Sequence, residues 1–432
     1  MKILIDKNIP YVEHFFADHL DQIEYFSDED FEIENVKEDS VVVVRSTYKT
    51  HGKKIPESVK LLCSASTGQD HIDLSQQYDD DYNVILPCRF STGANAIAVR
   101  EYVFSALALM LKERKFNKSQ DSAAIIGLGN IGKELYKVLD FFGFSVFGSD
   151  PILDFYYWLD LSLDEMGKLN YTEEDLRELH EESNFFKRIP GTDHYHGGIT
   201  YREHGDWSDD AILIENDLFT KNNIKLISLH VPLVKVSHLD TAAFSTHHLI
   251  GKSCLENLKN EAIIINTSRG GVVCEKDFLE LDDDLHYIRL ISDVFENEPN
   301  INKDFLDKNL FATPHIAGHS QYARYQMTKM AYENVADFLG IKNTEKENIL
   351  ENKIVDFDKN TFDQDMKEFG LPVSLMLDTY NPKLDHFECA DFKKIRDNYN
   401  SRIGYSQVVI KGCEDDSDRI ALKMLGFKVQ DS

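Results

Sequence analysis

The sequence predicts an α/β protein in which two domains with parallel sheets are followed by a small α+β domain. Three observations lead to this prediction. Short apolar runs alternate with polar, helix-compatible stretches along most of the chain. The runs are continuous, which is typical of strands that are covered on both faces. The chain also has 432 residues, which is more than one ordinary core holds and favours two or three domains.

The first domain is expected to comprise residues 1–94 together with 313–342. Residues 93–114 contain enough apolar side chains for a long buried helix that connects this domain to the next. An amphipathic helix at 325–340 is expected to pack back on the first domain. The strands of this domain are predicted at 2–6 ("KILID"), 41–45 ("VVVVR"), 60–66 ("KLLCSAS") and 83–88 ("NVILPC").

The second domain is expected to comprise residues 95–312. An acidic, aromatic-rich stretch at about 153–210, with a helix expected near 172–187, breaks its rhythm and predicts an insertion. The strand-containing segments of the domain are "SAAIIGLGNIG", "FSVFGSD", "KLISLHVPL", "EAIIINTSRGG", "YIRLISDVF" and "LFATPH".

The third domain is expected at 345–432, after a charged linker. It contains strand-like residues 405–412 ("YSQVVIKG") and helix-like residues 417–425 ("SDRIALKML"). Its length of roughly 80 residues is ordinary for a small domain.

Charge and cysteine content exclude several classes of protein. The net charge of −28 repels phosphate backbones, so we expect no nucleic-acid partner. The sequence has no run of about 18 apolar residues, and its N-terminal "MKILIDKNIP" lacks the features of a signal peptide, so we expect no membrane association. Six cysteines without a CxxC pair are typical of reduced thiols in a cytoplasmic protein.

A glycine-rich loop follows the first strand of the second domain. Its "GLGNIG" stands between an apolar strand and a helix, and a second strand leads to Asp150, 18 positions after Gly132. This βαβ context predicts a dinucleotide site with the pyrophosphate at the helix N-terminus. The Asp150 carboxylate would bind the ribose and repel a 2′-phosphate, which favours NAD over NADP; the alternative is a helix cap in an ordinary strand–turn–helix. The residues expected to contact the cofactor are Gly127, Gly129, Asn130, Ile131, Gly132 and Asp150.

Polar side chains stand at three later strand ends. Arg269 lies in "NTSRGG", Glu298 in "ISDVFENEP" and His315 in "ATPHIAGHS". Ligands of an open parallel sheet bind beyond the carboxyl ends of its strands. We therefore expect these side chains to face the same crevice as the glycine loop.

This set of side chains predicts the oxidation of a 2-hydroxy acid. His315 would take the hydroxyl proton, because a histidine side chain ordinarily titrates near neutrality. Glu298 would hold the imidazole in one tautomer and favour its protonated form. Arg269 would bind the carboxylate through two parallel hydrogen bonds. Each residue alone has a structural alternative, as an ion-pair partner, a loop histidine or a turn residue.

Four segments, in this order, resemble the D-isomer-specific 2-hydroxyacid dehydrogenases: "GLGNIG", "INTSRGGVV", "DVFENEP" and "PHIAG". Other segments are similar to the branch of this family that oxidises 4-phospho-D-erythronate: "MKILIDKNIPY", "VVRS", "SASTGQDHID", "GANAIAVREYVFSAL" and "FKKIRDNYNSR". The resemblance covers nearly the whole chain apart from the insertion. It implies a flavodoxin-like substrate domain, an NAD-binding Rossmann domain and a C-terminal domain that forms a homodimer.

The resemblance implies that NAD accepts a hydride from 4-phospho-D-erythronate in pyridoxal 5′-phosphate (vitamin B6) biosynthesis, giving (R)-3-hydroxy-2-oxo-4-phosphooxybutanoate. It assigns catalysis to Arg269, Glu298 and His315, with His315 as the general base. The further cofactor contacts that it implies are Val231, Thr267, Asp293 and Gly318, and the substrate contacts are Ser46, Ser66 and His319.

Three of these residues depart from the family pattern. Val231 and Ser66 stand where the family usually has a threonine, and His319 stands where it tends to have a tyrosine. Val231 therefore cannot make the side-chain hydrogen bond to the cofactor that a threonine would make. The candidate side chains for binding the substrate phosphate are Arg45, Lys49 and His319.

Two other functions compete with this interpretation. One is another D-2-hydroxyacid dehydrogenase, such as a phosphoglycerate dehydrogenase, and the other is a non-catalytic NAD-sensing interaction protein on the same fold. The insertion is interpreted as a flap or an added dimer contact. No metal site is expected there, because the spacing of its potential ligands matches no standard zinc pattern. These ligands are Asp193, His194, His196, Glu203 and His204.

Overall fold

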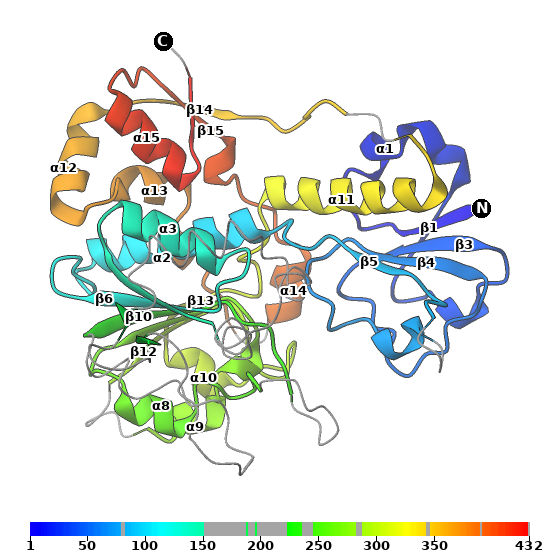
Figure 1. Cartoon of the computed structure of the whole chain (residues 1–432), viewed down its shortest axis with the longest axis horizontal. Coiled ribbons are helices and arrows are strands. Elements are labelled where there is room, and N and C mark those ends of the chain that lie inside the picture. Colours follow the sequence, from blue (N-terminus) through cyan, green and yellow to red (C-terminus); the bar gives the residue numbers. More distant parts are fainter. Residues whose placement is uncertain are drawn as a thin grey trace. The chain divides into compact units, whose positions relative to one another are not determined.

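The computed structural model describes residues 1–78, 83–150, 187–188, 195–196, 223–235, 245–281, 287–342, 346–388 and 391–430. They form two compact units (Figure 1). Unit 1 comprises Met1–Ala98, Gly318–Ile354 and Ser401–Val409, and unit 2 comprises Val99–Ala317, Val355–Asn400 and Ile410–Ser432.

Unit 1 is built on a parallel sheet of five strands in the order β2-β1-β3-β4-β5. The first strand pairs with a neighbour on each side, so the chain reverses its direction of winding between β1 and β3. Such a switch point opens a crevice at the carboxyl ends of the strands. The strands are β1 (Lys2–Asp6), β2 (Ile23–Phe26), β3 (Ser40–Val44), β4 (Val59–Ser64) and β5 (Cys88–Phe90).

Helix α11 (Gln321–Leu339) packs on the unit 1 sheet, as the sequence predicts. Its Tyr332 and Val335 share a buried cluster with Ile5 of β1 and Val43 of β3. Gly340 ends the helix in the left-handed conformation. The smaller helical elements of unit 1 are α1 (Val12–Phe15), η1 (Ala17–Gln22), η2 (Ile33–Asn35) and η3 (Leu74–Gln77).

Two details of the unit 1 sheet differ from the sequence prediction. The strand expected at 83–88 is wrong, because β5 begins only at Cys88, and Val84 and Ile85 are exposed. Pro87 has no N–H to donate to a ladder, so the pairing with β4 starts after it. The sequence also gave no sign of β2, which is a half-exposed strand without a continuous apolar run.

Unit 2 contains a parallel sheet of six strands in the order β13-β12-β11-β10-β6-β7. The chain passes from β6 outward to β7 and then returns to β10 on the other side, so the switch point lies between β6 and β10. The strands are β6 (Ser122–Ile126), β7 (Ser145–Ser149), β10 (Ile224–Leu229), β11 (Ile263–Asn266), β12 (Arg289–Ser292) and β13 (Asn309–Ala312).

Helices cover both faces of the unit 2 sheet, which explains its continuous apolar strands. Helices α2 and α3 lie on one face, and α8, α9 and α10 lie on the other (Figure 1). This arrangement confirms the predicted α/β fold with parallel sheets. The helical elements are α2 (Ala96–Lys112), α3 (Gly132–Phe141), α8 (Lys252–Asn257), η5 (Gly270–Val272), α9 (Glu275–Leu279) and α10 (Lys303–Asp307).

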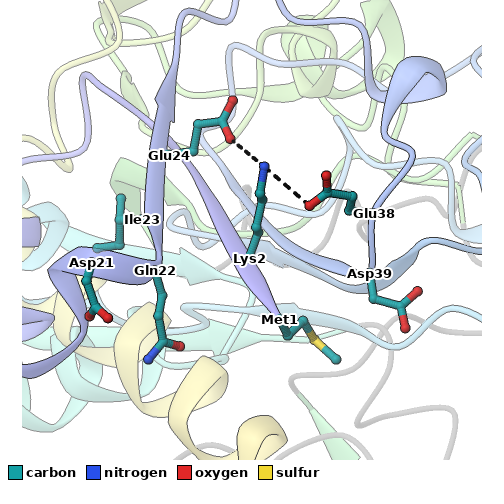
Figure 2. Close-up of a pocket in the computed structure, with 8 residues that line it drawn as sticks. All are labelled: Met1, Lys2, Asp21, Gln22, Ile23, Glu24, Glu38 and Asp39. Carbon is teal, nitrogen blue, oxygen red and sulfur yellow. Dashed lines mark hydrogen bonds and ion pairs between the residues drawn. The ribbon is translucent and has the colours of Figure 1, made fainter.

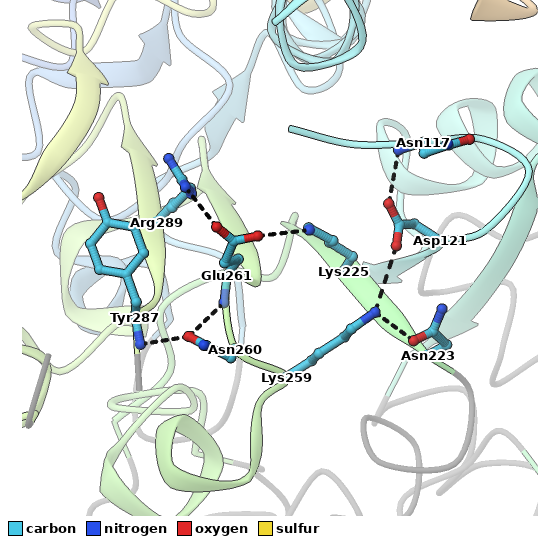
Figure 3. A network of polar contacts seen from close by, with 9 residues as sticks. All are labelled: Asn117, Asp121, Asn223, Lys225, Lys259, Asn260, Glu261, Tyr287 and Arg289. Carbon is cyan, nitrogen blue, oxygen red and sulfur yellow. Dashed lines mark hydrogen bonds and ion pairs between the residues drawn. The ribbon is translucent and has the colours of Figure 1, made fainter. Parts of the chain in front are cut away.

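A polar network ties together the amino-end side of the unit 2 sheet (Figure 3). Glu261 accepts hydrogen bonds from Arg289 at 3.1 Å and from Lys225 at 3.4 Å. Lys259 donates to the side chain of Asn223 at 2.7 Å. These ion pairs and amides satisfy one another, so the network at the amino ends of the strands has a structural role. Ligands of such a sheet bind at the carboxyl ends of the strands.

A hollow of about 510 Å³ lies at the amino-end side of the unit 1 sheet (Figure 2). Lys2 is its one basic lining residue, and its Nζ lies 3.3 Å from both Glu24 and Glu38. Carboxylates dominate the remainder of the lining, so this hollow suits no anionic substrate. The lining residues are Met1, Lys2, Asp21, Gln22, Ile23, Glu24, Glu38 and Asp39.

The C-terminal residues contain the strand and the helix predicted at 405–412 and 417–425, now seen as β15 and α15. A sheet with the order β14-β15-β16 joins them. The division into a separate domain at 345–432 stays a prediction. The elements are β14 (Lys353–Asp356), α12 (Lys359–Phe369), α13 (Val373–Thr379), η6 (Pro382–Asp385), α14 (Phe392–Asp397), η8 (Tyr405–Gln407), β15 (Val408–Lys411), α15 (Asp416–Leu425) and β16 (Lys428–Val429).

Most of the predicted insertion, including the helix near 172–187, lies outside the described residues. Two short strands, β8 (Lys187–Arg188) and β9 (Tyr195–His196), pair antiparallel. Asp193, His194, Glu203 and His204 belong to the part that is not described. Over the described ranges, no group of side chains has a metal-binding arrangement. No helix in those ranges combines the length and apolarity needed to cross a membrane.

The packing of unit 2 predicts a large cost for truncating its central strand. Ile264 of β11 is fully buried between Ile227 and Leu290, so Ile264→Ala should lower the free energy of unfolding by about 2–5 kcal/mol. Ile85→Ala is the matched control, because Ile85 is 61% exposed, and its effect should stay within about 0.5 kcal/mol. Urea unfolding measures both values; equal costs would contradict this placement of the two side chains.

Candidate active site

The glycine loop connects β6 to α3 at the switch point of the unit 2 sheet. Gly127 has φ +90°, and a Cβ there would lie 2.7 Å from the carbonyl carbon of His230. A Cβ on Gly132 would lie 1.8 Å from the Gly127 oxygen, so α3 begins in contact with the loop. Gly129 has open space around its Cβ position, and Asn130 beside it is exposed. The loop therefore leaves one accessible backbone face at the start of a helix, as a pyrophosphate requires.

Asp150 follows β7 and lies directly beside this loop. Its carboxylate accepts a hydrogen bond from the Leu128 N–H at 2.7 Å, and the residue is 8% exposed. The structure thus gives Asp150 a role in holding the loop. Its predicted contact with the ribose of NAD stays a prediction. Ile131 is half-buried at the start of α3.

The ends of β10 and β11 present two buried polar atoms that lack a partner among the described residues. One is Nδ1 of His230, whose Nε2 lies 2.8 Å from the Ser228 hydroxyl. Burial lowers the pKa of His230 to about 3, so its imidazole is neutral. The other atom is the Thr267 hydroxyl. Val231, also buried, offers no side-chain hydrogen bond. Unpaired buried polar atoms indicate a ligand or ordered water, so this surface fits a dinucleotide.

Arg269 stands in a turn that Asn266 organises. The Asn266 Oδ1 accepts hydrogen bonds from the Ser268 N–H at 3.1 Å and from its hydroxyl at 2.8 Å. The Asn266 amide donates to the Arg269 carbonyl at 3.0 Å, and the Arg269 guanidinium donates to the Ser268 carbonyl at 2.9 Å. A Cβ on Gly270 would lie 1.9 Å from the Phe295 carbonyl carbon, so this glycine admits the neighbouring strand end.

Asp293 organises the turn that follows β13. Its Oδ1 accepts from the Thr313 hydroxyl at 2.6 Å and from the Ile316 N–H at 2.7 Å, and its Oδ2 accepts from the Ala317 N–H at 2.9 Å. Burial raises the pKa of Asp293, although these donors oppose the rise. His315 lies within the turn at φ +58°, and its N–H donates to the Asp293 carbonyl at 2.7 Å. The predicted cofactor contact of Asp293 stays a prediction beside this structural role.

Glu298 and His315 form a hydrogen-bonded pair. The His315 Nδ1 lies 2.7 Å from the Glu298 Oε2, and the Phe295 N–H donates to the other oxygen at 2.9 Å. Burial alone would raise the pKa of Glu298, but the charge and hydrogen bond of His315, with Phe295 and the charge of Arg396, lower it. An ionised carboxylate only accepts, so Nδ1 carries the proton and the lone pair of the neutral ring lies on Nε2.

A second pair of carboxylates, Glu275 and Glu296, lies next to the Glu298–His315 pair; Glu296 stands in the polar strand end "ISDVFENEP", but no sequence pattern predicts its contact with Glu275. The Glu296 N–H donates to Glu275 at 2.7 Å, the Glu275 N–H lies 3.3 Å from the Glu296 carboxylate, and His248 lies 3.0 Å from the same carboxylate. Burial, with the charges of Glu296 and Glu298, raises the pKa of Glu275 to about 7. The pair fixes the segment that precedes Glu298.

The predicted substrate residues belong to unit 1, where Ser46 and Ser66 follow strands of the sheet and His319 stands just before α11. Ser46 follows β3 and is exposed. Ser66 is 9% exposed, and its hydroxyl lies 2.7 Å from that of Ser64. His319 is half-buried, and a Cβ on the adjacent Gly318 would lie 2.6 Å from the side chain of Asn95.

The candidate phosphate ligands of unit 1 differ in their surroundings. Arg45 contacts Asp6 at 2.7 Å and Asp28 at 3.0 Å, so two carboxylates already neutralise it. Lys49 is exposed.

Comparisons with known proteins identify relatives of this chain. Residues 222–317 match the family model described as D-isomer specific 2-hydroxyacid dehydrogenase, NAD binding domain. The erythronate-4-phosphate dehydrogenase of Psychromonas ingrahamii is 30% identical over 344 residues, which cover 79% of this chain and 73% of that protein. The enzyme of the same name from Pseudoalteromonas translucida is 28% identical over 437 residues, covering 99% of this chain and 100% of that one.

A solved structure shares the fold. The D-lactate dehydrogenase of Aquifex aeolicus, complexed with NAD and lactic acid, superposes with a TM-score of 0.52 at 19% identity. The match covers 78% of this chain and 96% of that one.

The raised pKa of Glu275 predicts a stability that depends on pH. The folded state favours the neutral carboxyl, so the stability present below the ordinary pKa of 4.5 is lost as the pH rises through about 7. Glu275→Gln, which is always neutral, should therefore be more stable than the natural protein at pH 8, by about 1–3 kcal/mol, and should match it near pH 4.

Thermal unfolding at the two pH values measures this difference. Glu280→Gln, at an exposed position just after the same helix, is the control and should stay within about 0.5 kcal/mol at both. A Glu275→Gln protein that is less stable at pH 8 would show that the buried charge is compensated.

Proposed function

Because the chain belongs to the D-isomer-specific 2-hydroxyacid dehydrogenase family, among its erythronate-4-phosphate dehydrogenases, we propose that it oxidises 4-phospho-D-erythronate. The chain is an NAD-dependent oxidoreductase. The product would be (R)-3-hydroxy-2-oxo-4-phosphooxybutanoate, an intermediate of pyridoxal 5′-phosphate biosynthesis. The observation that supports this proposal most is the Glu298–His315 pair, because a hydride-transferring dehydrogenase needs a base for the hydroxyl proton.

His315 is the proposed general base. Glu298 holds the proton of the imidazole on Nδ1, so Nε2 can accept the proton of the 2-hydroxyl group. The imidazolium that forms then lies 2.7 Å from an ionised carboxylate, which stabilises it. His315 keeps 30% of its side chain exposed, so a substrate can reach the ring.

The glycine loop and the ends of β10 and β11 are the proposed NAD site. When bound, NAD supplies the acceptor for the hydride from the substrate carbon. Gly129 would admit the pyrophosphate, and the polar atoms of His230 and Thr267 would find their partners in the cofactor. Asp150 disfavours a 2′-phosphate at the end of β7 because of its charge.

Arg269 is the proposed clamp for the substrate carboxylate. A guanidinium offers two parallel donors, which match a carboxylate in charge and in geometry. Its turn is fixed by Asn266, and Gly270 seats this turn against the backbone that leads to Glu298. The distance between the Arg269 side chain and the Glu298 carboxylate would thereby stay constant. On the substrate side, Ser46, Ser66 and His319 are proposed contacts, with Arg45 and Lys49 near the phosphate.

A homodimer formed by residues 345–432 and a cytoplasmic location complete the proposal. Large apolar side chains of this segment are exposed, among them Ile354 at 59% and Leu384 at 82%, as a buried dimer contact requires. The described cysteines are unpaired, as in a reducing compartment: Cys63, Cys88, Cys254, Cys274 and Cys413. Light scattering on the purified protein decides between one and two chains of 49.7 kDa.

The direct test of the proposed reaction is the formation of NADH from NAD and 4-phospho-D-erythronate, followed by absorbance. D-3-phosphoglycerate and unphosphorylated hydroxy acids are the comparison substrates. Preference for one of these over 4-phospho-D-erythronate would overturn the proposed substrate. Absence of turnover with every acid, together with NAD binding, would favour the NAD-sensing alternative.

Replacing the base should separate chemistry from cofactor binding. His315→Asn retains an amide that can donate to Glu298 but has nothing in place of Nε2. Turnover should fall at least about a hundredfold, while the affinity for NAD, measured by titration calorimetry, stays within about twofold. His51→Asn, at an exposed site of unit 1, is the control. Turnover close to normal in His315→Asn would remove this residue from the mechanism.

Replacing the guanidinium of Arg269 by an ammonium group should weaken substrate binding. Arg269→Lys keeps the charge but loses the two parallel donors, so the KM for the acid should rise and kcat should fall, each by about tenfold or more. Arg289→Lys, at the amino end of β12, is the matched control. If Arg269→Lys leaves the response to substrate unchanged, the clamp role is refuted.

A further inference from the structure

We propose that Tyr102 and Thr313 form a buried hydrogen-bond relay to Asp293 that positions the catalytic turn carrying His315. The proposal rests on the proposed function, since it assigns a purpose to geometry around the proposed base. Tyr102 belongs to α2, Thr313 follows β13 and Asp293 follows β12, so the relay connects three separate elements of unit 2.

The order of donors in the relay follows from proton counting. The Thr313 hydroxyl lies 2.6 Å from the Asp293 carboxylate and 2.8 Å from the Tyr102 hydroxyl. A threonine hydroxyl has a single proton, which goes to the carboxylate as the stronger acceptor. Tyr102 must then donate to the Thr313 oxygen, so the three groups point in one direction toward Asp293.

Water cannot replace the relay, because all three residues are buried. Tyr102 and Thr313 are 0% exposed, and Asp293 is 1% exposed. Loss of one hydroxyl there removes a hydrogen bond that solvent does not replace. The relay therefore constrains the Asp293 carboxylate more tightly than a surface contact would.

The carboxylate transmits this constraint to His315. Its two oxygens accept the N–H groups of Ile316 and Ala317, directly after the histidine. The N–H of His315 itself is held by the Asp293 carbonyl at 2.7 Å. A rotation of the carboxylate would move the turn and lengthen the 2.7 Å contact between His315 and Glu298. Small misplacements of this kind reduce turnover more than binding.

The outer end of the relay is held by the C-terminal part of unit 2. The ring of Tyr380 lies 6.1 Å from the ring of Tyr102, and its hydroxyl donates to Asp385 at 3.0 Å. Tyr399 donates to the same carboxylate at 2.9 Å. Residues beyond 355 therefore contribute to positioning the base in addition to the homodimer proposed for them.

The test uses paired variants of the full-length protein. Thr313→Val keeps the shape of the side chain and removes the hydroxyl, whereas Thr313→Ser keeps the hydroxyl. We expect kcat for 4-phospho-D-erythronate to fall about tenfold or more in Thr313→Val, with the KM for this acid within about twofold, and to stay near normal in Thr313→Ser. Tyr102→Phe should lower kcat about threefold to tenfold. Tyr332→Phe, a buried tyrosine of unit 1, is the control.

A double variant separates a relay from two independent packing effects. If Tyr102 acts through Thr313, adding Tyr102→Phe to Thr313→Val should lower kcat by less than about twofold more. Additive losses, or a folded Thr313→Val protein with normal kcat, would overturn the relay. If Thr313→Val does not fold, Tyr102→Phe still tests it, because a normal kcat in that variant has the same meaning.

An NMR readout distinguishes failure of the relay from failure of the proposed function. The imidazole signals of His315 should shift in Thr313→Val and Tyr102→Phe but not in Thr313→Ser or Tyr332→Phe. If this pattern of shifts appears but the natural protein oxidises no hydroxy acid, the proposed function is refuted and the relay is not. Unshifted His315 signals in all four variants would refute the relay, whatever the substrate.

Discussion

The carboxylate of Asp293 lies at the end of β12 with 1% exposure and accepts three hydrogen bonds from the turn after β13. Because a buried carboxylate without donors would cost several kcal/mol, the turn has little freedom to depart from it. His315 occupies the centre of this turn at φ +58°, a left-handed conformation that is uncommon for residues other than glycine and that these hydrogen bonds stabilise. The orientation of the imidazole toward Glu298 therefore follows from the way that β12 and β13 end.

The charges around the dyad divide into groups that stabilise it and groups that oppose it. His315 and Arg396 lower the pKa of Glu298, whereas burial raises it. The carboxylate of Glu298 in turn adds to the burial that raises the pKa of Glu275 to about 7. One of two neighbouring carboxyls is thus ionised and the other is partly neutral at physiological pH. This separation leaves one ionised partner for His315, the proposed base, and avoids two ionised carboxylates side by side.

Much of this architecture could be predicted from the sequence, because the continuous apolar runs of parallel sheets show where the strands lie and end. The runs at 122–126 and 263–266 predict buried strands, and the glycine spacing with its βαβ context predicts the loop between β6 and α3. Contacts that depend on tertiary packing could not be predicted. Tyr102 lies in the apolar run that predicts the helix at 93–114, and nothing in that run indicates its contact with Thr313; no sequence pattern sets Glu275 apart. β5 begins only after Pro87, which has no N–H to donate to the neighbouring strand. β2 lacks the continuous apolar run by which the other strands were predicted.

In the proposed mechanism, Glu298 fixes the tautomer of His315, so that Nε2 is the atom that takes the substrate proton. The imidazole nitrogen signals in a ¹⁵N–¹H correlation spectrum of the protein above pH 8 report this tautomer directly, with His315→Asn for assignment. We expect a protonated Nδ1 and a lone pair on Nε2. A His315 ring protonated on Nε2 would contradict it, because no lone pair would then face the substrate.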